Sequence, residues 1–278
     1  VAFSRSNILT SSWDGRARLF DLEGTLLRTL PDTGDGVTRF SPDGAHILTY
    51  GEYGVTVWPV HKPMRDAQQL EPSLMLVGMT SQGPLVISGE QTHLLDPRDM
   101  RTVKTMDLRA RAVDSESDRI LWLAHDGSVG VSTFDGENLP LGRVPGCGQG
   151  VSAVRGESAA IGCPDGQVTI WSGDSQYLAT HRAGVESLAL TADGRAIVGL
   201  SDGSVAVQHQ DQIRCFAAGQ SGAVLSVEAT PTGLVSSGED HRVRTFDRHC
   251  QLLHVFEGHT KGVWRAIPSP DGTRILSS

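Results

Sequence analysis

Five aspartates are the clearest set of residues in this chain that could do acid–base chemistry: Asp14, Asp126, Asp165, Asp202 and Asp240. Two carboxylates brought together by a fold can act as general acid and general base. Each of these aspartates, however, is followed by glycine or histidine and falls in a different copy of a repeated pattern. An Asp-Gly pair is a tight-turn signal, because aspartate bonds back to the backbone and glycine accepts positive φ. We therefore predict that they are structural turn residues and not a catalytic site.

The second candidate is a group of zinc-ligand types comprising His249, Cys250, His254 and His259. On an extended strand His249 and His254 point to opposite faces. Cys250 and His254 share a face but would stand about 13 Å apart at roughly 3.4 Å per residue. Zinc lies about 2.1–2.3 Å from its ligands and cannot bridge that gap. We predict no metal and no cofactor.

Other catalytic motifs are missing from the sequence. It has neither a G-x-S-x-G nucleophile elbow between a strand and a helix nor a P-loop lysine. The glycine-rich segment 146–150 joins two repeats and does not open a helix, so we expect a permissive loop. These observations predict a protein that is not an enzyme.

Charge and composition limit the partners. The 278 residues carry a net charge of −8, and the 24 Lys and Arg residues are spread thinly, so nucleic-acid binding is not expected. No apolar run approaches the roughly 18 residues needed to cross a membrane. The start resembles no signal peptide, although the absence of an initiator Met leaves targeting signals open. We expect a cytoplasmic location and no membrane partner.

The four cysteines, Cys147, Cys163, Cys215 and Cys250, form no C-x-x-C pair. This pattern favours unpaired thiols in a reducing compartment. One disulfide in an exported protein is the alternative.

The elements that position these residues are repeated. Eight stretches resemble one another at steps of 34 to 41 residues, and a fixed period in this range indicates an array of one supersecondary unit. The aligned positions, each just before a tight turn, are Phe3, Phe40, Met79, Ser115, Gly156, Leu190, Ala229 and Pro268.

Each repeat reads as four short strands. In the last copy, 263–267 is a strand, Ser269-Pro270-Asp271-Gly272 a turn, and 273–278 a second strand. Elsewhere an Asp-Gly turn joins a third strand, as at Asp165-Gly166 before 168–171, and a fourth, outer strand follows, as at 252–256. Four antiparallel strands in about 38 residues make one propeller blade. No helical periodicity appears, so the predicted fold class is all-β.

The pattern resembles the WD40 repeat, whose marks are a Gly-His pair, an Asp-Gly turn and a Trp-Asp-like pair. Gly258-His259 matches the first mark, and His181 stands at the equivalent place two repeats earlier. Phe20-Asp21, Trp171-Ser172 and Phe246-Asp247 match the last. The resemblance implies a buried network in which His181 and His259 partner aspartates, with Trp171 as a further member. No repeat holds the complete network, so we expect apolar packing between blades to carry most of the stability.

The resemblance implies a WD40-like β-propeller spanning residues 1–278, with seven full repeats and a half repeat. Seven blades are favoured and eight are possible, and we expect the chain to be a piece of a longer protein. The segment 59–72 reads as a surface loop. The repeat boundaries are 1–34, 35–72, 73–108, 109–149, 150–183, 184–222, 223–261 and 262–278.

Binding residues are predicted at one end of the blades. Trp13 precedes an Asp-Gly turn and Trp264 lies early on an inner strand, and the resemblance places both toward the top rim of a central channel. Exposed tryptophan is a frequent interface hot spot; the alternative is tryptophan packed between blades. His125, Ser201 and Glu239 occupy the place of Trp13, and Glu186 that of Trp264.

The predicted function is a non-catalytic scaffold or sensor module that binds a protein or peptide. The repeats look similar to WD40 arrays of large bacterial multidomain proteins, which implies possible contacts with other domains of the same chain. One alternative is a propeller enzyme of the hydrolase or lactonase type with a channel site. Another is a nucleic-acid or chromatin reader, which would need basic residues gathered on one face.

Overall fold

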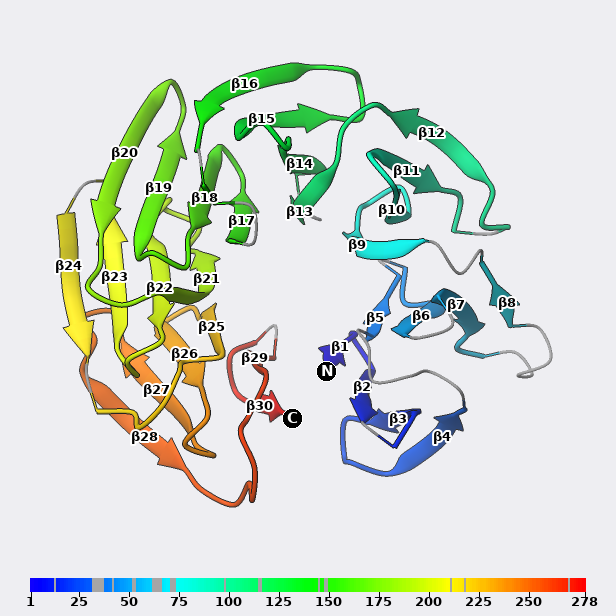
Figure 1. The fold of residues 1–278 in the computed structure, drawn as a ribbon. Helices are drawn as coiled ribbons and strands as arrows, with labels where there is room; N and C mark the ends of the chain where they lie inside the picture. Colours follow the sequence, from blue (N-terminus) through cyan, green and yellow to red (C-terminus); the bar gives the residue numbers. More distant parts are fainter. Residues whose placement is uncertain are drawn as a thin grey trace. The chain divides into compact units, whose positions relative to one another are not determined.

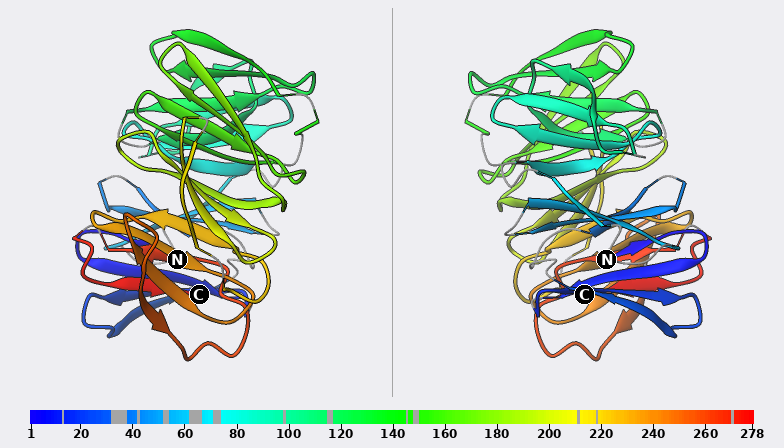
Figure 2. Two further views of the ribbon diagram at one scale, coloured as in Figure 1. Left: turned by 90° about the vertical axis from the view of Figure 1, so that its left-hand side faces the viewer. Right: turned by 90° about the vertical axis from the view of Figure 1, so that its right-hand side faces the viewer.

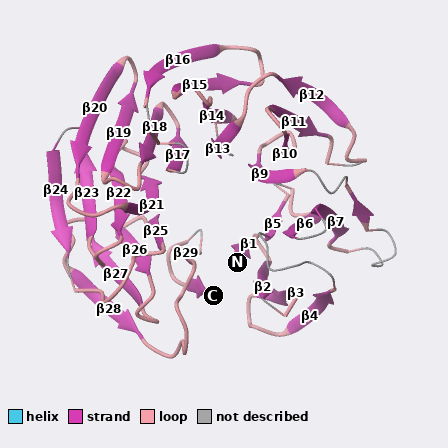
Figure 3. Cartoon of the chain, in the orientation of Figure 1, coloured by secondary structure: helices cyan, strands magenta, loops and turns pink. Residues whose placement is uncertain are grey.

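A computed structural model of the chain describes most residues. The described ranges are 1–12, 14–31, 38–41, 43–51, 54–61, 67–70, 74–97, 99–114, 117–144, 146–147, 150–210, 212–217, 219–269 and 271–278. Among them the regular elements are strands joined by turns and loops (Figure 3). No helix in these ranges is long and apolar enough to cross a membrane.

The chain divides into two compact units, an amino-terminal unit from Val1 to Asp118 and a carboxyl-terminal unit from Arg119 to Ser278. The prediction of a single domain over residues 1–278 stays a prediction. The candidate sites discussed below lie within the carboxyl-terminal unit, so each can be described from its own residues.

The amino-terminal unit holds three complete four-stranded sheets, each with its strands in chain order, and the strand β13 (Figure 1). The sheets are β1 (Ala2–Phe3), β2 (Asn7–Ser12), β3 (Arg16–Asp21) and β4 (Leu26–Leu30); β5 (Thr38–Phe40), β6 (His46–Gly51), β7 (Gly54–Pro59) and β8 (Gln68–Gln69); and β9 (Met75–Met79), β10 (Pro84–Ser88), β11 (Gln91–Leu95) and β12 (Thr102–Met106). Strand β13 is Ala110–Asp114.

The carboxyl-terminal unit continues the same pattern. Strand β13 begins the sheet β13–β16, whose other strands are β14 (Arg119–Leu123), β15 (Ser128–Thr133) and β16 (Asn138–Arg143). The following sheets are β17 (Val151–Arg155), β18 (Ser158–Gly162), β19 (Gln167–Ser172) and β20 (Ser175–Thr180); β21 (Val185–Leu190), β22 (Ala196–Leu200), β23 (Val205–His209) and β24 (Gln212–Ala217); β25 (Ser226–Ala229), β26 (Gly233–Ser237), β27 (Val243–Asp247) and β28 (Leu252–Phe256); and the two-stranded β29 (Ala266–Pro268) and β30 (Ile275–Ser277).

The described strands thus form seven four-stranded antiparallel sheets and one two-stranded sheet. This confirms the predicted all-β propeller fold with seven full repeats and a half repeat. Each sequence repeat contains the strands of one sheet. The side views in Figure 2 show that strands of one sheet cross at an angle, as in any twisted sheet.

Burial differs sharply between inner and outer strands. Every residue of β18 and of β22 is buried, whereas every residue of β28 is exposed. A strand with small and β-branched residues can be covered on both faces by its neighbours, and the outermost strand has neighbours on one side only. The sequence 252–256, Leu-Leu-His-Val-Phe, is nevertheless apolar, so composition alone does not show which strand is outermost.

The hydrophobic core lies between neighbouring sheets. One cluster joins β17–β20 to β21–β24 through residues such as Ala160, Ile170 and Leu200. The next joins β21–β24 to β25–β28 through Ile197 and Phe246, among others. Apolar contacts between neighbouring sheets therefore stabilise this unit. That these contacts contribute more than the polar network stays a prediction.

The glycine of the Asp-Gly turn is needed for close packing as well as for its conformation. Gly166 and Gly203 have φ values of +89° and +84°. A Cβ atom on Gly203 would collide with the carbonyl oxygen of Gln220, and one on Gly166 with that of His181. The chain leading to the next sheet thus runs directly over each turn.

The prediction of unpaired cysteines is wrong for this structure. Cys147 is bonded to Cys163, with Cα atoms 5.2 Å apart, and Cys215 to Cys250, with Cα atoms 5.8 Å apart. These separations lie in the usual disulfide range. Sequence spacing hid the pairs because partners 16 and 35 residues apart become neighbours only when the repeats fold and stack.

Candidate binding face in the carboxyl-terminal unit

The five turn aspartates each bond within their own turn. A carboxylate oxygen accepts a hydrogen bond from the backbone N–H two residues later, at distances from 2.9 Å for Asp126 to 3.3 Å for Asp240. The same bond is made by Asp14, Asp165 and Asp202. Bonds from Ser128 and from Arg143 lower the pKa of Asp126 to about 2. These carboxylates are occupied as acceptors, each in a different sheet.

The position where the WD40 resemblance places a network histidine is filled in three different ways. Before β17 it is Cys147, whose disulfide reaches Cys163 at the end of β18. Before β21 it is His181, which is buried and interacts electrostatically with Asp202. Before β25 it is Gln220. Cys147 and His181 thus each interact with a residue of the following repeat, at or beside the turn between its second and third strands.

Gln220 is part of a buried polar network that the sequence did not reveal. Its Nε2 donates to Ser236 Oγ at 2.9 Å, and its Oε1 accepts from Arg244 Nη1 at 3.2 Å. Arg244 Nη2 also donates to Asp240 Oδ2 at 2.6 Å. The side chains of Arg244 and Asp240 are only 8% and 3% exposed. Burial alone would raise the pKa of Asp240, but the hydrogen bond and charge of Arg244 hold it below its usual value.

Two other predicted network residues have different partners. His259 is exposed, and its Nε2 pairs with Ser277 Oγ at 2.8 Å; its predicted partnership with an aspartate stays a prediction. Trp171 is buried, but its Nε1 donates to the carbonyl oxygen of Leu141 in the preceding sheet at 3.0 Å.

His181 should make stability depend on pH. Burial lowers the pKa of His181 below the ordinary value of 6.5, so the unfolded chain binds a proton more readily than the folded one. Unfolding free energy should therefore fall as pH drops below about 6.5, until the folded pKa is reached. His181→Phe should flatten that part of a urea-unfolding series, and the two proteins should show parallel curves above about pH 7.5. Equal slopes below pH 6.5 would contradict the assignment.

The zinc-ligand types noted in the sequence, His249, Cys250, His254 and His259, do not converge on one point. Cys250 is committed to its disulfide with Cys215. Among the described residues, no three or more His, Cys, Asp or Glu side chains converge as ion ligands would.

Trp264 is the largest exposed apolar side chain of the described residues, at 62% exposure. Its neighbour Val263 is fully buried, and the N–H of Val263 donates to the carbonyl oxygen of Gly238 at 2.9 Å. The N–H of Trp264 donates to the carbonyl oxygen of Ser278 at 2.8 Å. Successive residues of an extended chain point to opposite sides, so anchoring Val263 inward directs Trp264 outward.

Glu239 and Leu225 adjoin the same segment. A Cβ on Gly262 would contact the Cα of Glu239 and the Cδ1 of Leu225, at 3.5 and 3.8 Å. The Oε2 of Glu239 accepts from the N–H of Ala223 at 3.0 Å, which fixes this exposed carboxylate. We call Leu225, Glu239, Gly262 and Trp264 the Trp264 face. Leu225 was not predicted; it occupies in its own repeat the place of Glu186 and Trp264, and that alignment was the available signal.

The remaining predicted binding residues lie at equivalent places in other sheets. Ser201 precedes its turn as Glu239 does, and its Oγ accepts from the N–H of Gly184 at 3.1 Å. His125 and Glu186 are exposed at the corresponding positions of β14–β15 and β21. Trp13 lies outside the described residues, so its role stays a prediction.

Comparisons with known proteins agree with this architecture. Residues 250–278 match the family described as "WD domain, G-beta repeat". A search of curated proteins found no match. The computationally designed protein Ika8 is similar in structure, with a TM-score of 0.73, 19% identity, and coverage of 99% of this chain and 94% of that one.

A natural protein is similar to the same extent. Sqt1 of Saccharomyces cerevisiae gives a TM-score of 0.74 at 15% identity, with coverage of 98% of this chain and 90% of that one. At such identities the likeness shows the fold alone. Together with the repeated four-stranded sheets, it shows that the chain has a β-propeller fold, in which residues 250–278 match one WD40 repeat.

Proposed function

We propose that the chain is a non-catalytic binding module that recognises a protein or peptide through the Trp264 face. WD40 propellers are commonly interaction scaffolds and typically lack enzymatic activity. The observation that carries the proposal is the 62% exposure of Trp264 on a segment whose neighbouring residue is fully buried. Leaving a large aromatic ring in water on a rigid support gives up apolar burial, which a partner can recover.

The surroundings of Trp264 fit the anatomy of an interface. Leu225 adds partly buried apolar surface, and Glu239 adds a carboxylate fixed by a backbone bond. An apolar centre with a polar margin is the usual arrangement at protein interfaces. The partner is a separate protein or, if the chain is part of a longer multidomain protein, another domain of that protein.

The test is affinity capture with the native protein and with Trp264→Ala as bait. The captured partner should bind Trp264→Ala at least about 30-fold more weakly, the loss expected for a hot-spot residue. The free energy of unfolding should change by no more than about 0.5 kcal/mol, because the side chain is exposed. Binding is measured by calorimetry with the purified partner, and stability by urea unfolding.

A matched control is Leu252→Ala, which removes an apolar side chain of 53% exposure from the outer strand β28. This variant should retain the partner. If Trp264→Ala binds as tightly as the native protein, or if it unfolds at much lower urea, the Trp264 face is not the recognition surface. If neither bait captures a partner, the contact with another domain of the same protein becomes the favoured form of the proposal.

A further inference from the structure

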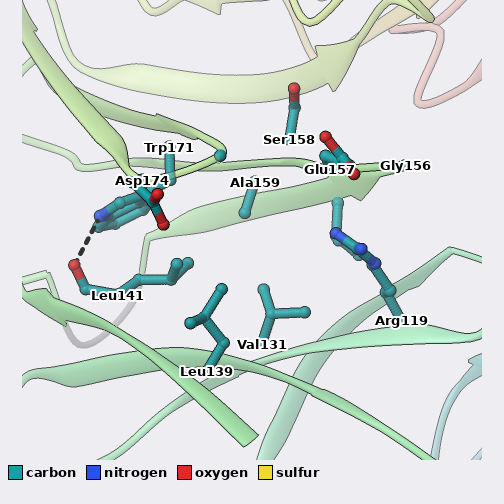
Figure 4. Close-up of a pocket in the computed structure, with 12 residues that line it drawn as sticks. Arg119, Val131, Leu139, Leu141, Gly156, Glu157, Ser158, Ala159, Trp171 and Asp174 are labelled. Carbon is teal, nitrogen blue, oxygen red and sulfur yellow. Dashed lines mark hydrogen bonds between the residues drawn. The ribbon is translucent and has the colours of Figure 1, made fainter. Parts of the chain in front are cut away.

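A small pocket lies between two neighbouring sheets of the carboxyl-terminal unit, at the end of the strands opposite the Asp-Gly turns. Residues lining it come from β14–β16 on one side and from β17–β20 on the other (Figure 4). Its volume is about 150 Å³. Sites for whole drug-sized ligands are usually about 300–1,000 Å³, so this pocket suits one side chain.

The floor and one wall of the pocket are apolar. Leu139 and Leu141, two residues apart on β16, point to the same face and line it together with Val131 (Figure 4). Trp171 forms the wall, held by the bond from its Nε1 to the Leu141 carbonyl oxygen at 3.0 Å. Leu139 is 49% exposed, so apolar surface remains open to a ligand at the edge of the pocket.

The charged residues at the pocket are Arg119, Glu157 and Asp174. Among the described residues, none of these three side chains has a hydrogen bond or ion-pair partner, and Arg119 as a whole is half-buried. A partly desolvated cation without an anion loses hydration energy that no ion pair replaces. A ligand with a carboxylate would supply the missing partner, because the planar guanidinium binds carboxylates through two parallel hydrogen bonds.

We propose that this pocket binds an apolar residue that carries a free α-carboxylate, with its side chain against Leu139, Leu141 and Trp171 and its carboxylate on Arg119. Two sources have this chemistry: the carboxyl-terminal residue of a peptide and a free apolar amino acid. A free amino acid also carries an ammonium group, for which Asp174 on the Trp171 side of the pocket is the available anion (Figure 4).

Replacing Glu157 should change the affinity of the ligand in the opposite direction to replacing Arg119. Its side chain lies on the same side of the pocket as Arg119 (Figure 4). A carboxylate there repels the carboxylate of the ligand and competes for the guanidinium. Glu157→Gln should therefore tighten binding several-fold, whereas Arg119→Gln should weaken it about tenfold or more. A ligand that instead presented a cation to the pocket would reverse both effects.

The experiment is calorimetric titration of the full chain with three probes. These are N-acetyl-Gly-Gly-Leu with a free carboxylate, the same peptide with an amidated end, and free leucine. The free-carboxylate peptide should bind about tenfold or more tightly than the amide. Free leucine binding as tightly as that peptide assigns the source to amino acids, and weaker binding assigns it to peptide ends.

Two control variants distinguish binding at this pocket from binding at the Trp264 face. Arg182→Gln, which removes an exposed arginine elsewhere in the unit, should leave binding unchanged, and so should Trp264→Ala. The proposal is overturned if the amide binds as well as the acid, if Glu157→Gln weakens binding, or if no probe binds at about 1 mM.

Discussion

Replacing Arg244 with leucine should lower the free energy of unfolding by about 3–5 kcal/mol, because the change leaves the Asp240 carboxylate buried without its cation. The same substitution removes the donor to Gln220 Oε1, which lies in the same buried network. The loss is measured as a shift of the urea midpoint at constant slope, followed by circular dichroism.

Two comparisons test whether burial of the Arg244–Asp240 pair causes the expected loss of stability. Arg18 and Asp14 form the same i,i+4 pair in the first repeat, but their side chains are 29% and 44% exposed. Arg18→Leu should therefore have a much smaller effect, since water screens exposed ion pairs. The double variant Arg244→Leu with Asp240→Asn should regain part of the lost unfolding free energy, because it leaves no buried charge unpaired.

Acid should remove the difference between native protein and Arg244→Leu. The pKa of Asp240 is lowered in the folded protein, so the stability that the pair supplies is fully present above the ordinary aspartate pKa of 3.8 and is lost as pH falls through the folded value. If Arg244→Leu unfolds at the native urea midpoint at neutral pH, the network does not stabilise the seventh repeat.

Removing either disulfide should also destabilise the carboxyl-terminal unit strongly. The closed loops span 16 and 35 residues. In the chain-entropy description, closing loops of these lengths contributes about 3 and about 4 kcal/mol, respectively. We therefore expect Cys215→Ala with Cys250→Ala to lower stability more than Cys147→Ala with Cys163→Ala, as measured by urea unfolding without reductant.

Thiol titration of the denatured protein is the direct check on the pairing. Protein purified without reductant should show no reactive thiol, and prior reduction should release all four. Thiols that react before reduction would restore the original expectation of unpaired cysteines. The same assay on protein trapped in its native cells would test the predicted cytoplasmic location, because disulfides persist mainly in oxidising compartments.

The fold could be predicted from the sequence to the level of strands and repeats. The Asp-Gly turns did this: at Asp165 and Asp202 the aspartate bonds to the backbone two residues later, and the following glycine adopts positive φ. The repeat length then restricts each copy to four short strands. Such signals are local, so they are present even in a chain in which no repeat holds the complete WD40-type network.

The candidate site was only partly predictable. Trp264 and Glu239 were found by aligning repeats, but alignment could not separate an exposed tryptophan from one packed between blades. The structure places Trp264 outside because Val263, one residue earlier, is fully buried and bonded to Gly238. Trp171 occupies another aligned position and is buried, with its bond directed to the neighbouring sheet.

The sequence by itself determined the strands, the turns and the number of repeats, because these depend on residues close together along the chain. Only the tertiary structure decided which distant residues meet: Cys147 with Cys163, Gln220 with Arg244, and Arg119 with the apolar floor around Leu141. Such pairs depend on how one sheet packs on the next, and side-chain identity within a repeat carries little information about that packing.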